Sequence, residues 1–86
     1  MSARDDLMEL AARFPELKDL SVQVERLALD AAAGIDPASY LDHFKALRQA
    51  WHLRQESLAS CRMRWEEADR LKRVMDRILA DMRPKV

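Results

Sequence analysis

Two histidines and one cysteine are the side chains of this sequence that most often serve metal binding or catalysis. His43 and His52 are nine positions apart, which places them on different faces of a helix. His52 and Glu56 are one helical turn apart and could touch one edge of a metal ion, but a site needs more than two ligands. The sequence therefore predicts solvent-facing histidines on a helix, no metal site and no cofactor.

The cysteine, Cys61, has no partner in the sequence for an intramolecular disulfide. Catalysis by a thiolate needs a lowered pKa and a base within reach. The neighbouring Arg62 could favour a thiolate, but no histidine is placed to pair with it on the same helix. We expect Cys61 to pack as a small hydrophobic residue, we predict no catalytic residues, and we expect that the protein is not an enzyme.

Arg54 and Lys72 interrupt an otherwise apolar stripe and allow three interpretations. Their aliphatic stems could pack while their charged ends reach water or select an oligomeric state. Arg54 could instead face an acid of the first helical region, such as Glu25 or Asp19. A buried arginine could also hold a small anion, with Arg54, Lys72 and Glu25 lining a pocket between helices. No spacing among these residues favours a particular reaction.

The second half of the chain is rich in basic residues that could follow a nucleic-acid backbone. These residues are Arg62, Arg64, Arg70, Lys72, Arg73, Arg77, Arg83 and Lys85. Acidic residues at helix-surface spacing lie among them, as in the pair Glu66 and Arg70, and this pattern is typical of a solvated helix face. A small nucleic-acid-binding dimer that uses this arginine-rich half is therefore the alternative function.

The composition favours one small all-helical domain. The chain has 86 residues, of which 49% are hydrophobic, 35% are charged and one is glycine. The formal net charge is zero, but residues 1–43 carry five excess acids and residues 44–86 carry five excess bases. No basic and apolar leader and no apolar run of membrane-spanning length are visible, so we expect a cytoplasmic protein with no membrane contact.

Gly34 and the pair Asp36-Pro37 mark one sharp turn. Glycine suits the position just past a helix, and Asp followed by Pro suits the start of the next helix. The first helix is expected over about 2–33, kinked or briefly broken at Pro15, and the turn over 34–36. Its apolar stripe includes Leu20, Val24 and Leu27.

The second helix is expected over about 37–82, ending at Pro84, because no glycine or proline lies between Ala38 and Arg83. Apolar residues recur at four-three spacing from Tyr40 to Met82, which favours a coiled coil or bundle. The two helices would form an antiparallel hairpin. A break between Ser57 and Ser60, which would give three helices, is the alternative to a continuous helix.

A helix of this length, about 70 Å, would project well beyond the shorter first helix. Its apolar side chains beyond the hairpin would then need another molecule to cover them. The predicted interaction residues are Trp51, Leu58, Trp65, Leu71, Met75, Ile78, Leu79 and Met82. We expect a homodimer, or a complex with another helical protein, to bury this surface.

The stretch Asp36-Pro37-Ala38-Ser39-Tyr40, followed by Leu47 and Ala50, resembles the small helical-hairpin co-chaperones of type III secretion needle subunits. The likeness implies a bacterial-type small chaperone in which Tyr40, Leu47 and Ala50 pack the hairpin. This chain is longer than those proteins, with a C-terminal extension. The predicted function is a non-enzymatic protein-protein interaction module, such as a small chaperone, adaptor or regulator.

Overall fold

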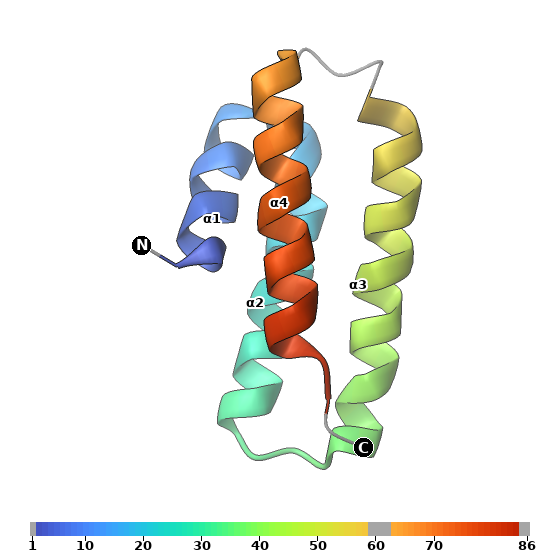
Figure 1. Ribbon diagram of the computed structural model, residues 1–86. Coiled ribbons are helices and arrows are strands. Elements are labelled where there is room, and N and C mark those ends of the chain that lie inside the picture. The colour runs from blue at the N-terminus through green and yellow to red at the C-terminus, as the bar shows by residue number, and fades with distance from the viewer. Residues whose placement is uncertain (1, 59–62, 85–86) are drawn as a thin grey trace.

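The chain folds into a bundle of four helices, in a computed structural model that describes residues 2–58 and 63–84 (Figure 1). The elements in chain order are α1 (Ala3–Arg13), the short 3-10 helix η1 (Pro15–Leu17), α2 (Lys18–Ala32), α3 (Pro37–Ser57) and α4 (Trp65–Met82). Helices α1 and α3 run in one direction, and α2 and α4 run in the other (Figure 1). Each helix packs on its two neighbours around the bundle, and the α3–α4 contact is the smallest. The predicted all-helical class is confirmed.

The first helical region is two helices rather than one kinked helix. Helix α1 begins at a capping box in which the Ser2 hydroxyl accepts from the Asp5 amide and the Asp5 carboxylate accepts from the Ser2 amide. It ends at Arg13 because Phe14 precedes a proline and adopts an extended backbone, with φ −124° and ψ 93°. The predicted position of the interruption at Pro15 is therefore correct. The helix is interrupted there, and α2 lies alongside α1 instead of continuing it.

The turn between α2 and α3 has the predicted helix-ending and helix-starting residues. Gly34 has a φ of 71°, and the amides of Gly34 and Ile35 donate to the carbonyls of Ala31 and Asp30. These two bonds close the last turn of α2 in the pattern that favours glycine. The Asp36 carboxylate accepts from the amide of Ala38, and Pro37 is the first residue of α3.

The continuous helix predicted over 37–82 is wrong. Helix α3 ends at Ser57 and α4 begins at Trp65, so the chain reverses direction between them (Figure 1). The reason is burial: Leu71, Met75 and Ile78 of α4 are fully or almost fully buried in the bundle, and burying such side chains is worth several kilocalories per mole. This gain outweighs the helix propensity of the connecting residues. Helix α4 ends at Met82, before Pro84, as predicted.

One hydrophobic core joins all four helices. Its buried members are Leu7, Leu10, Leu17, Leu20, Val24, Leu27, Phe44, Leu47, Trp51, Leu71, Val74, Met75 and Ile78. The structure has a radius of gyration of 12.8 Å, close to the value of about 12 Å expected for a compact chain of this length. The bundle therefore covers internally most of the apolar surface that the sequence alone left without a partner.

Candidate functional site: the outer face of α2

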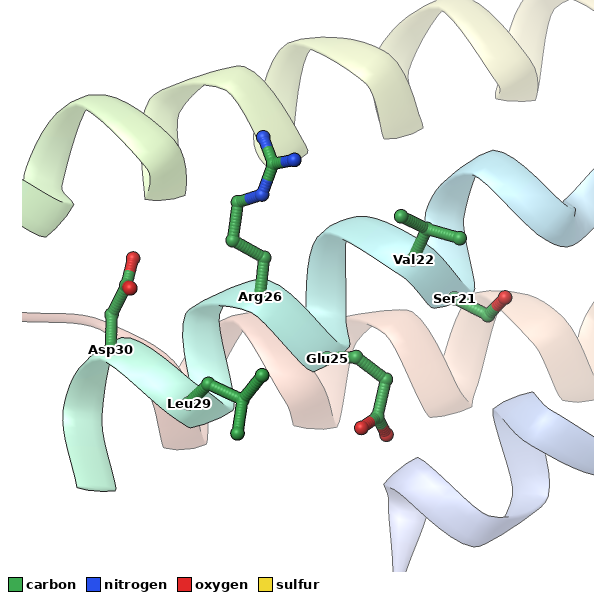
Figure 2. A pocket seen from close by; sticks show the side chains of 6 residues that line it. All are labelled: Ser21, Val22, Glu25, Arg26, Leu29 and Asp30. Atoms are coloured by element: carbon green, nitrogen blue, oxygen red, sulfur yellow. The ribbon is translucent and has the colours of Figure 1, made fainter. Parts of the chain in front are cut away.

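The side of α2 that points away from the core carries two large apolar residues. Val22 is 50% exposed and Leu29 is 68% exposed. They lie at the rim of an open groove of about 390 Å³ on this face (Figure 2). The groove is lined by Ser21, Val22, Glu25, Arg26, Leu29 and Asp30. We call the four residues Val22, Glu25, Arg26 and Leu29 the outer face of α2.

The helical repeat explains why these residues share a face. Leu20, Val24 and Leu27 recur at spacings of four and three and are buried in the core. Val22 and Leu29 are seven positions apart, so they lie one above the other, about half a turn away from the core stripe. A solvated helix is ordinarily polar at such positions, which makes this face a candidate contact surface.

Charged groups flank the apolar pair on both sides. In Figure 2, Arg26 extends toward α3 and Glu25 extends toward α1. One oxygen of the Glu25 carboxylate accepts from Arg4 of α1 at 3.1 Å. Within the part of the chain that the structure describes, Arg26 has no acid within ion-pair distance. The outer face of α2 therefore has an apolar centre, with Glu25 on the edge toward α1 and Arg26 on the edge toward α3. Asp30 extends to the same side as Arg26, and its carboxylate lies beside His43 of α3.

The interaction residues predicted from the sequence occupy a different part of the molecule, and most are not exposed. Trp51, Leu71, Met75 and Ile78 are buried in the core of this chain. Leu58, Leu79 and Met82 are partly buried and pack against that core. Trp65, at the start of α4, is exposed by 79%. The expectation of an uncovered stripe on a projecting helix is therefore wrong, because α4 folds back and packs on α1.

Several arginines of the basic half hold helices together. Arg54 of α3 donates to Asp19 of α2 at 3.2 Å, which is one of the three arrangements the sequence left open. Arg70 of α4 donates to both Asp6 and Glu9 of α1, each at 3.2 Å. The hydrogen bonds to Glu9 and then to Asp6 raise the pKa of Arg70 above its usual value, so its charge is constant throughout the neutral range.

Arg13 of α1 donates to Glu67 of α4 at 2.9 Å, which adds a further ion pair between the same two helices. Arg73 and Arg77 pair with acids one turn away on α4 itself. Lys72 is exposed on α4, while Arg54 and Glu25 are engaged by Asp19 and Arg4. The anion pocket considered for Arg54, Lys72 and Glu25 therefore gains no support.

The histidines are exposed, as expected, and each lies beside one carboxylate. The His43 Nδ1 atom is 2.6 Å from the Asp30 carboxylate across the α2–α3 contact, and His52 is 3.6 Å from Glu56 on the same helix. Among the described residues, no group of three or more His, Cys, Asp or Glu side chains could hold a metal ion. Cys61, for which core packing was predicted, lies outside the described residues.

Tyr40, Leu47 and Ala50 were expected to pack a hairpin because of the co-chaperone resemblance. Leu47 is buried, and Tyr40 and Ala50 are partly buried against the core. Comparison of the chain with protein-family models, curated proteins and solved structures found no match. Over the described residues, no helix combines the length and apolar character needed to cross a membrane. Function is therefore inferred from the surface of the bundle.

Val22 and Leu29 were not predicted as contact residues. The apolar stripe predicted for this helix includes Leu20, Val24 and Leu27, and that stripe forms the core. The missed signal is a second apolar pair on the same helix, displaced by half a turn from the first stripe. A single core buries only one face of such a helix, so a second apolar face on the opposite side remains exposed.

Proposed function

We propose that this chain is a non-enzymatic protein-protein interaction module and that its binding surface is the outer face of α2. The observation that carries the proposal is the exposure of Val22 and Leu29, two turns apart on one face and lining an open groove, on a helix whose other face is already buried. Removal of such side chains from water on binding is favourable by about 25 cal/mol per Å² of apolar surface.

The flanking charges support specific binding rather than general adhesion. Arg26 and Glu25 lie on opposite edges of the apolar pair, so a partner with complementary charges is favoured in one orientation (Figure 2). A chaperone, adaptor or regulator would use such a surface in the same way. The chaperone role implied by the co-chaperone resemblance is one form of this proposal.

The nucleic-acid alternative has less support from the structure. Arg13, Arg54 and Arg70 each bind a carboxylate of another helix. Arg73 and Arg77 are each neutralised by a neighbouring acid on α4. Basic side chains that are already paired contribute less to phosphate binding, because the protein contact must be broken first.

Site-specific photo-crosslinking in cells of the source organism tests the proposal. A photoreactive amino acid replaces Leu29 in one variant and Gln49, an exposed polar residue of α3, in the matched control. The proposal predicts a defined protein adduct, either with another protein or with a second copy, from position 29 and none from position 49. No adduct at position 29, or the same adducts at both positions, would contradict it.

A further inference from the structure

We propose that the outer face of α2 binds the same face of a second copy of this chain, with the two α2 helices parallel to each other. This inference rests on the proposed function and names the partner. It follows from the positions of four residues, Val22, Glu25, Arg26 and Leu29, and from the signs of their charges. Contact residues on other helices are not needed for the argument.

The four residues have the spacing of a helix-helix contact. They stand at positions i, i+3, i+4 and i+7, which is the set of side chains that one helix presents to another at a contact point. Val22 and Leu29 lie along the middle of the face, separated by two turns. Glu25 and Arg26 lie between them in height, one on each edge (Figure 2).

The symmetry of a dimer decides which charges meet. If the two helices are parallel, the two-fold axis runs along them and exchanges the left and right edges of the face. The edge that carries Arg26 in one copy then lies beside the edge that carries Glu25 in the other, so Arg26 approaches the partner's Glu25. The same pair forms a second time on the other side of the axis, and the apolar residues meet their own counterparts in the middle.

An antiparallel pair would have the opposite result. Its two-fold axis is perpendicular to the helices and leaves each edge on its own side. When Val22 of one copy lies opposite the partner's Leu29, so that the apolar residues meet, Arg26 lies beside the partner's Arg26 and Glu25 beside the partner's Glu25. Like charges in contact weaken association, and therefore charge complementarity selects the parallel arrangement.

The existing contacts of the face are compatible with this pairing. Arg4 donates to the Oε1 atom of Glu25, and both side chains of that ion pair are about half exposed, so the Oε2 atom of Glu25 can accept from a second arginine. Arg26 has no acid within ion-pair distance among the described residues. Dimerisation supplies Arg26 with an acidic partner.

The dimer is expected to be weak and reversible. In the proposed dimer each copy contributes one helix with two apolar residues. The area buried by such a contact is smaller than that of a standard interface, and small interfaces are typical of transient association. We therefore expect dissociation constants between about 1 μM and 1 mM. A second protein with a helix of the same pattern could occupy the face, and the experiment below distinguishes that occupant from a second copy.

Sedimentation equilibrium of the full chain up to about 1 mM tests the inference. The wild type is expected to approach the mass of a dimer as its concentration rises. Leu29→Glu is expected to weaken association about hundredfold, since it places a charge at the apolar centre. Leu53→Glu is the matched control, because Leu53 is 58% exposed on α3 and lies outside the face. Circular dichroism of every variant verifies that the bundle remains folded.

Charge reversal tests the parallel arrangement. Arg26→Glu and Glu25→Arg, each alone, convert two attractive pairs into two repulsive ones and are expected to weaken association about tenfold. An equal mixture of the two single variants restores opposite charges at both contacts and is expected to recover dimers. Unchanged or tighter association of Arg26→Glu would overturn the parallel pairing.

Further outcomes decide the identity of the partner and of the face. A wild type that remains monomeric up to about 1 mM overturns self-association. If Leu53→Glu disrupts the dimer and Leu29→Glu does not, the face is wrong. A monomeric chain whose position 29 still crosslinks to a different protein in cells overturns the second copy as partner but leaves the proposed function standing, whereas a monomeric chain without crosslinks contradicts both.

Discussion

Gly34 has a backbone conformation that other residues adopt only with strain. Its φ of 71° closes the end of α2, and a Cβ atom added there would meet nothing within 4 Å. The constraint is therefore the backbone angle and not the available space. The sequence predicted this role because a glycine stands two residues before an Asp-Pro pair. The hydrogen bonds that the backbone amides of Gly34 and Ile35 donate confirm it.

Gly34→Ala is expected to lower the free energy of unfolding by about 1 kcal/mol, because alanine must adopt the left-handed conformation. Urea unfolding followed by circular dichroism measures the change. Gly34→Asn is the matched control and should cost less, since asparagine tolerates this conformation better. Equal or greater stability of the alanine variant would show that the turn has a different backbone.

Arg54 illustrates what a single sequence leaves open at the level of one residue. Its type and position allowed packing of the stem, an ion pair or an anion site, and only the register of α2 against α3 identifies Asp19 as the partner. Local patterns determine which face a residue occupies. The identity of its partner depends on how far one helix slides along another, which no local pattern specifies.

Helix α4 was predicted as the far end of a long helix, and its actual position depends on packing between distant segments. The interruption at Pro15 and the turn at Gly34 were predictable because proline and glycine constrain the backbone directly. Residues 58–64 contain neither, so nothing local required a break. The chain reverses there because α4 buries Leu71, Met75 and Ile78 within the bundle.

Leu71→Ala tests whether α4 belongs to the core of its own chain. It is expected to lower the free energy of unfolding by about 2–5 kcal/mol, which is typical when a buried leucine is truncated. Leu53→Ala, on the exposed side of α3, is the matched control and should change stability by less than about 0.5 kcal/mol. Chemical denaturation of both variants at low protein concentration provides the comparison. Similar small effects at both positions would mean that α4 does not pack as described.

Across the whole molecule, the opposite charges of residues 1–43 and 44–86 form ion pairs that join the helices of the bundle. Acids of the first half bind bases of the second half at Asp6 and Arg70 and at Asp19 and Arg54. The sequence shows the underlying asymmetry as an excess of acids in residues 1–43 and an excess of bases in residues 44–86. In the bundle these ion pairs join neighbouring helices that run in opposite directions, α1 with α4 and α2 with α3 (Figure 1).

Of the large apolar side chains that stay exposed among the described residues, Val22 and Leu29 are the two that lie on one helix, and we propose that this face of α2 binds a second copy of the chain. The sequence could not identify it, because the partners of α2 in the bundle were unknown before α4 was placed. Once α1, α3 and α4 cover the core side of α2, Val22 and Leu29 remain on the solvent side. The candidate site is therefore a consequence of the fold and not of a motif.

The most direct test of this claim is a dilution series of the isotopically labelled chain, followed by amide NMR chemical shifts. Concentration-dependent shifts are expected to concentrate at Val22, Glu25, Arg26 and Leu29, while the amide shifts of Leu71 and Ile78 remain unchanged. Shifts that concentrate on α4, or spectra that do not change with concentration at any position on α2, would contradict it.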